Sequence, residues 1–134
     1  MMALFLLCFI SVAEGEEWVL YSIGSSGKSY YYSKSIITYL TEDIVQVWSG
    51  TRYSDEGKKS LEKNFGVPDI SESRSLQEFN CRTKEMRTLT TGYYNSYEKE
   101  VLNAGNKPSG WMSIPQETRA ENLYKILCEK TQRN

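Results

Sequence analysis

The sequence contains no histidine among its 134 residues. Histidine is the commonest general base and a common metal ligand, so its absence excludes Ser-His-Asp and Cys-His catalytic arrangements. The formal net charge is only −1, from 16 basic and 17 acidic side chains. Dedicated nucleic-acid-binding domains are usually visibly basic, so we expect no nucleic-acid partner.

Long hydrophobic segments are also missing, with one short exception at the N-terminus. Ala3–Ala13 is apolar apart from Ser11, but a helix of this length reaches about 16 Å, roughly half of a bilayer core. The run matches the apolar region of a secretory signal, and small residues at Ala13 and Gly15 suit a cleavage site. We predict a signal peptide over residues 1–15 and one exported domain over 16–134, in the periplasm or at the cell surface. The alternative is a buried N-terminal helix or strand.

Cysteine is scarce, and the predicted cleavage removes Cys8. Cys81 and Cys128 remain, and an isolated pair in an oxidising compartment predicts one disulfide. The chain-entropy model gives a loop of this length about 4 kcal/mol of stabilisation. The alternative is two unpaired buried thiols. Zinc would need two further ligands, and we predict no metal site and no cofactor.

Short segments rich in strand-forming residues occupy most of the chain. Gly24–Gly27 reads as a turn, and Cys81 lies at the tip of a predicted hairpin. We expect mostly a surface loop over residues 54–73, with room for a short helix around Lys58–Asn64. The predicted strands are Trp18–Ile23, Lys28–Tyr32, Ile44–Tyr53, Ser75–Asn80, Met86–Tyr94 and Val101–Asn103.

The C-terminal segment has the pattern of an amphipathic helix. Thr118 followed by Glu121 is a capping-box signature. The apolar stripe consists of Ala120, Leu123, Tyr124, Leu127 and Cys128. Strands followed by one helix indicate an α+β fold, in which a small antiparallel β-sheet packs against the C-terminal α-helix and one disulfide joins them.

Motifs that would indicate catalysis are weak. Gly24–Ser29 (G-S-S-G-K-S) is two residues short of a phosphate-binding loop, and the tyrosines that follow favour a strand over the required helix. Ser25 and Lys28 match the S-x-x-K of penicillin-interacting enzymes without its companion motifs. Scattered glutamates such as Glu78 could pair for glycoside hydrolysis, but solvated carboxylates explain them better. We predict no catalytic residues.

Tyrosine is abundant, with ten residues and clusters at Tyr30-Tyr31-Tyr32 and Tyr93-Tyr94. Tyrosine is enriched at protein interfaces, so Tyr30, Tyr32, Tyr93 and Tyr94 are candidate ligand contacts. Arg82 and Lys84 at the predicted hairpin tip add a small basic patch. The alternative is that these tyrosines are ordinary strand and core residues.

Several short motifs occur together in a specific order. The sequence resembles the surface-adhesin protein E family of small exported bacterial proteins over about residues 17–130. It departs from the family pattern at Ser33-Lys34, where Asp-Pro is expected, and in residues 54–73. The motifs that carry the resemblance are Trp18-Val19, Tyr30-Tyr31-Tyr32, Val47-Trp48, Glu78-Phe79-Asn80-Cys81, Arg87-Thr88-Leu89, Trp111 with Ile114-Pro115, and Glu121-x-Leu123-Tyr124 before Cys128.

The resemblance implies a small sheet packed on a C-terminal helix and tied by a disulfide. It also implies an adhesin for host matrix or plasma proteins such as vitronectin, laminin and plasminogen. Our first hypothesis is therefore a non-enzymatic exported module that binds extracellular or envelope proteins, with residues 54–73 as a further contact segment. The alternative is a structural or assembly component of the envelope that forms homodimers or filaments through edge strands. A small hydrolase is a third class.

Overall fold

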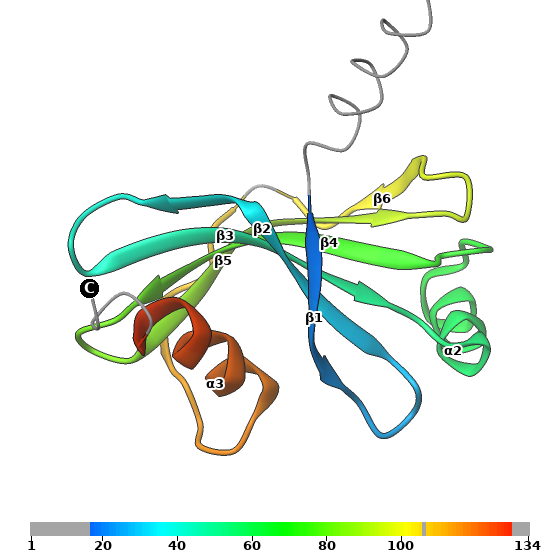
Figure 1. The fold of residues 1–134 in the computed structure, drawn as a ribbon. Coiled ribbons are helices and arrows are strands. Elements are labelled where there is room, and N and C mark those ends of the chain that lie inside the picture. The colour runs from blue at the N-terminus through cyan, green and yellow to red at the C-terminus, as the bar shows by residue number, and fades with distance from the viewer. Residues whose placement is uncertain (1–16, 106, 130–134) are drawn as a thin grey trace, which may run out of the picture.

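The computed structural model describes residues 17–105 and 107–129 (Figure 1). The predicted signal peptide, residues 1–15, lies outside these residues. Seven strands form one antiparallel sheet in the order β1-β2-β3-β4-β5-β6, and β7 also pairs with β5. The strands are β1 (Trp18–Ile23), β2 (Ser29–Tyr39), β3 (Ile44–Arg52), β4 (Glu72–Asn80), β5 (Glu85–Tyr94), β6 (Glu100–Asn103) and β7 (Met112–Ser113).

Two strands extend three or more residues beyond their predicted bounds. β2 continues to Tyr39 because its β-branched distal half pairs with β3, with Ile37 opposite Val47. β4 begins at Glu72, opposite Arg52. Pairing with the neighbouring strand therefore extends both strands through polar residues whose low strand propensity did not predict it.

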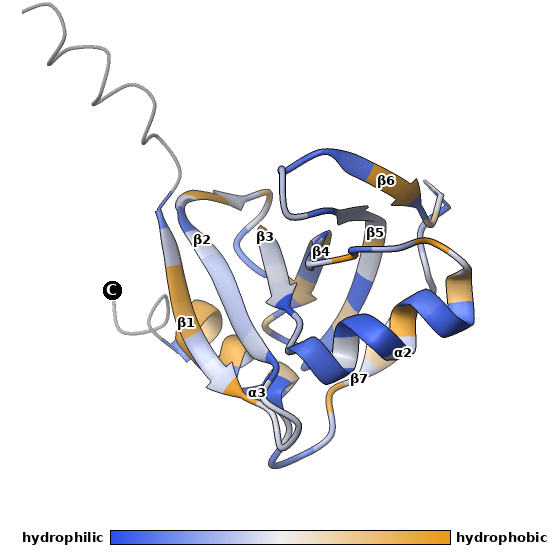
Figure 2. Ribbon diagram, turned by 90° about the vertical axis from the view of Figure 1, so that its right-hand side faces the viewer, coloured by the Kyte–Doolittle hydropathy of each residue, from blue (hydrophilic) through white to orange (hydrophobic). Residues whose placement is uncertain are grey.

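The short helix allowed around Lys58–Asn64 is confirmed and is longer than expected, since helix α2 spans Asp55–Phe65. The expectation of mostly surface loop over residues 54–73 is wrong for this half of the segment. Ser54 caps the helix by accepting a hydrogen bond from the Gly57 amide, and Gly66 ends it with a left-handed φ of 72°. No residue of α2 is buried, and Figure 2 shows it as mostly hydrophilic. Capping thus defines a helix that apolar periodicity could not reveal.

The C-terminal helix lies against one face of the sheet (Figure 1). Helix α3 (Arg119–Tyr124) continues directly into a wider π-helical turn, η1 (Lys125–Glu129). The predicted apolar stripe packs on the sheet, and the α+β fold class is confirmed. The buried core consists of Tyr32, Val45, Val47, Phe79, Ile114, Leu123, Leu127 and Cys128.

The predicted disulfide is present and ties this helix to the sheet. Cys81 follows β4 and bonds to Cys128 in η1, with an S–S distance of 2.05 Å. The hydroxyl of Tyr124 also donates to the Cys81 carbonyl at 2.9 Å. Thr118 caps α3 as predicted, by accepting a hydrogen bond from the Glu121 amide at 3.2 Å. These bonds fix the C-terminal helix to one corner of the sheet. The side of the sheet that this helix covers is called the helix face below.

Candidate functional site

The other side of the sheet, called the open face below, carries a set of aromatic and arginine side chains. Successive residues of a strand point to opposite faces, so Val45 and Val47 in the core place Gly50 and Arg52 of β3 on the open face. Register then places Arg74 of β4 opposite Gly50. A Cβ atom at Gly50 would lie 3.5 Å from the Trp18 ring, which shows how closely that indole covers the glycine.

Each of three arginines on adjacent strands lies over an aromatic ring. The guanidinium of Arg52 is 5.2 Å from the centre of the Tyr31 ring, and that of Arg87 is 4.6 Å from the Trp111 ring. The third, Arg74, is 4.5 Å from the Tyr94 ring and 5.9 Å from the Trp18 ring. These distances are in the range of cation–π attraction. The three arginines and the rings beneath them are called the arginine–aromatic row below.

Carboxylates hold two of these guanidinium groups in place. Nε of Arg74 donates to Glu72 Oε2 at 2.7 Å, and Nε of Arg87 donates to Glu78 Oε1 at 2.9 Å. Glu78 is buried and also accepts a bond from Gln46 Nε2 at 2.9 Å. This network links β3, β4 and β5 across the open face.

Arg52 differs from the other two arginines. Between residues 17 and 129, leaving out residue 106, it forms no ion pair within 4.0 Å. Its residue is exposed, whereas Arg74 and Arg87 are half-buried. A stacked guanidinium keeps the N–H donors on its edge available for a bidentate carboxylate. Of these three arginines, Arg52 is therefore the one that is available to an incoming group.

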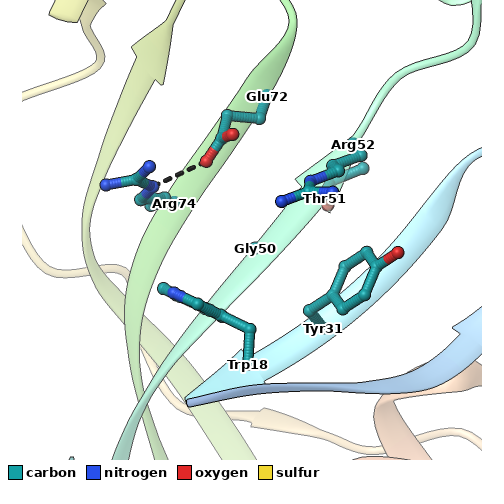
Figure 3. Close-up of a pocket in the computed structure, with 7 residues that line it drawn as sticks. All are labelled: Trp18, Tyr31, Gly50, Thr51, Arg52, Glu72 and Arg74. Carbon is teal, nitrogen blue, oxygen red and sulfur yellow. Dashed lines mark hydrogen bonds and ion pairs between the residues drawn. The ribbon is translucent and has the colours of Figure 1, made fainter. Parts of the chain in front are cut away.

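A small hollow lies beside Arg52, between β1, β2, β3 and β4 (Figure 3). Its volume is about 40 Å³, far below the roughly 300–1,000 Å³ of typical small-molecule sites. It suits a single polar group on a larger partner better than a free small molecule. Its lining residues are Trp18, Tyr31, Gly50, Thr51, Arg52, Glu72 and Arg74.

The placement of Tyr30 and Tyr32 as surface contacts is corrected by the structure. They are only 8% and 7% exposed, because both point to the helix face, where Tyr32 joins the core and Arg119 lies 4.3 Å from the Tyr30 ring. The residue between them, Tyr31, points to the open face instead. Period-two alternation separates the three tyrosines, but only the position of the helix decides which face is covered.

The second tyrosine cluster is split in the same way. Tyr94 lies on the open face beneath Arg74. Tyr93 points to the opposite side, where the centres of its ring and of the Phe65 ring are 5.5 Å apart. Of the four candidate tyrosines, the structure therefore brings only Tyr94 into the arginine–aromatic row.

The two basic candidates, Arg82 and Lys84, lie away from the arginine–aromatic row. The Arg82 side chain is 72% exposed and pairs with Asp43 at 3.2 Å. Lys84 Nζ is 2.6 Å from Glu121 Oε2, so this cation holds the hairpin to the C-terminal helix. Helix α2, from the segment expected to add contacts, is also separate from the hollow, since none of its residues lines it.

Sequence reasoning missed Trp18, Arg52, Arg74 and Trp111 as a group. Alternation in Ile44–Arg52 could have placed Arg52 on the same face as Trp48. Arg74 lay outside the predicted strand, and Trp111 reaches the face from an irregular segment. Their convergence from distant positions left no local pattern.

In the ranges 17–105 and 107–129, no group of three or more Cys, Asp or Glu side chains could hold a metal ion. No helix within the described part of the chain is long and apolar enough to cross a bilayer.

Comparison with known proteins gives a family and a fold. The model of the surface-adhesin protein E family matches residues 18–129. A structure of Haemophilus influenzae protein E superposes with a TM-score of 0.62 at 14% identity and covers 90% of this chain and 89% of that chain. A second crystal form gives a TM-score of 0.60 at 15% identity and covers 77% and 82%. No curated protein sequence matches this chain. At these identities the structural likeness concerns the fold alone.

Proposed function

The chain belongs to the surface-adhesin protein E family, and on this premise we propose that it is an exported, non-enzymatic module that binds other proteins through its open face. The observation that carries the proposal is the row of arginines stacked on aromatic rings, with Arg52 left without an ion pair among the described residues. The partners are extracellular-matrix or envelope proteins. Residues 1–15 act as the signal peptide and residues 16–134 form the exported domain.

The residue types of the row support protein binding. Tryptophan, tyrosine and arginine dominate the residues whose loss most weakens protein complexes. Their usual surroundings are a partly desolvated centre with polar groups at the rim. The open face is similar in composition, since half-buried Trp18 and Tyr31 line the hollow together with the exposed Arg52. The hollow offers a partner carboxylate both an aromatic wall and a guanidinium.

Binding to immobilised extracellular-matrix and plasma proteins, including vitronectin and laminin, tests the proposal. The Arg52→Gln and Tyr31→Ala variants remove the available cation and its ring, and Arg82→Gln removes an exposed arginine away from the row. We expect the first two to weaken binding about tenfold or more, as losses at interface hot spots do, and Arg82→Gln to leave it nearly unchanged. Equal effects of Arg52→Gln and Arg82→Gln would refute the open face as the contact surface.

One observation favours the second candidate function, assembly through edge strands. β1 lies at the edge of the sheet and carries no charged residue, and its Leu20 and Ile23 side chains are exposed. Uncharged apolar edges promote pairing between chains. Sedimentation velocity over a wide range of concentrations tests this candidate, since a strict monomer would exclude it.

A further inference from the structure

The edge of the sheet next to β2 is only partly covered. β1 pairs with β2 from Ser29 to Ser33, and Glu17 then bonds to the Lys34 amide at 2.7 Å and to the Ser35 hydroxyl at 3.0 Å. From Ile36 to Tyr39, no strand in the described part of the chain pairs with β2 on this side. Figure 1 shows β2 continuing past β1 into the hairpin with β3.

Two residues of this segment direct their backbone N–H and C=O groups away from the sheet. The Leu40 amide donates to the Ile44 carbonyl at 2.9 Å, and register pairs Thr38 with Gln46 and Tyr39 with Val45. Hydrogen-bonded and non-bonded pairs alternate in antiparallel strands. Leu40 and Thr38 therefore bond inward to β3, while the amides and carbonyls of Ile37 and Tyr39 face outward.

The surroundings of this edge are apolar. Ile36, Tyr39 and Leu40 are 43%, 53% and 49% exposed. Tyr39 also borders a hollow of about 190 Å³ beside the Cys81–Cys128 disulfide, which has room for one long side chain. Peptides that add to a sheet edge gain affinity from main-chain bonds and specificity from such adjacent pockets.

The charge at the rim of this hollow is mainly acidic. Glu42, Asp43 and Arg82 line it. Asp43 pairs with Arg82 at 3.2 Å, whereas Glu42 forms no ion pair with any described residue. A lysine or arginine entering here could lay its apolar stem along Tyr39 and bring its cation to Glu42.

We propose that the Ile36–Tyr39 edge of β2 binds an extended segment of a partner protein as an added strand, with a basic residue of that segment opposite Tyr39. Main-chain bonds to Ile37 and Tyr39 hold the segment, and the hollow beside the disulfide selects its basic side chain. This surface is an edge of the sheet, so it is separate from the open face and its arginine–aromatic row.

The test uses a short capped peptide of alternating valine and threonine with a central lysine, and a matched peptide with glutamate in that position. We expect the lysine peptide to slow hydrogen exchange at the Ile37 and Tyr39 amides and to bind about two- to five-fold more tightly than the glutamate peptide, the range of one exposed ion pair. The Glu42→Gln variant should bring the two affinities together. Arg52→Gln should leave both unchanged, which separates this edge from the open face.

Tyr39→Pro and Tyr39→Ala form a matched pair of variants. Both remove the ring, but only proline removes the outward N–H donor, and edge strands tolerate proline at such positions. We expect Tyr39→Ala to retain weakened binding and Tyr39→Pro to lose it, with both proteins folded by circular dichroism. Equal binding by the two variants, or no protection with either peptide, would overturn the proposal. Protection that rises with protein concentration alone would also overturn it, because a second copy would then occupy the edge.

Discussion

Lys84 Nζ lies 2.6 Å from Glu121 Oε2, which joins the β4–β5 hairpin to the first turn of the C-terminal helix. The Cys81–Cys128 disulfide joins the same hairpin to η1, at the other end of that helix. Glu121 Oε1 also accepts a bond from the Glu117 amide at 2.8 Å. The helix that covers the core is thus held by a covalent bond and by an ion pair from two neighbouring positions of one hairpin.

Loss of the disulfide should strongly reduce stability. Cys81 and Cys128 are separated by 47 residues, and the chain-entropy model gives a loop of this size about 4 kcal/mol. We expect Cys128→Ser to lower the free energy of unfolding by a few kcal/mol, as measured by denaturant titration of the oxidised protein. Wild type under reducing conditions should show a similar loss, and an unchanged midpoint would contradict the prediction.

Loss of the Lys84 cation should affect stability and leave binding intact. The hydrogen bond from Lys84, followed by that from the Glu117 amide, lowers the pKa of Glu121. Lys84→Met should lower the melting temperature by less than loss of the disulfide does, because the disulfide still holds the helix. Since the lowered pKa favours the folded state above the ordinary pKa of glutamate, the difference from wild type should shrink as the pH falls below about 4. A pH-independent difference would show that the carboxylate is not involved.

Adjacent tyrosines of β2 should lose very different amounts of stability on replacement by alanine. Tyr32 is in the core, and loss of a buried aromatic ring costs about 3–5 kcal/mol. Tyr31 lies on the open face under Arg52, where the cost should stay within about 1 kcal/mol. Thermal unfolding should separate the two variants, and only Tyr31→Ala should weaken partner binding while remaining fully folded. The same loss of stability in both would contradict this assignment of faces.

Stability should also fall at alkaline pH. Burial raises the pKa of Tyr21 from 10.0 to about 12, against the opposing charge of Arg119. The folded state therefore disfavours tyrosinate, and its stability is fully present below pH 10 and is lost as the pH rises toward 12. This corresponds to roughly 2–3 kcal/mol. Denaturant titrations across this range should show the loss, and Tyr21→Phe should reduce it.

The sequence determined local features that depend on neighbouring residues. Alternation at the start of Ile44–Tyr53 predicted β3, and the apolar stripe with its Thr118 cap predicted the C-terminal helix. The two remaining cysteines predicted the disulfide. These predictions are correct because a strand or an amphipathic helix must present one apolar side to the core. That requirement sets the spacing of apolar residues along the sequence.

Only the tertiary structure decided which face of each strand is exposed. Alternation separates Tyr31 from Tyr30 and Tyr32, but it cannot say which side the C-terminal helix will cover. The arginine–aromatic row is set by strand register, which brings Trp18, Arg52 and Arg74 together from three strands. Register depends on pairing between distant segments, and an irregularity in that pairing shifts it, so the pattern of one strand taken alone does not fix which residues become neighbours.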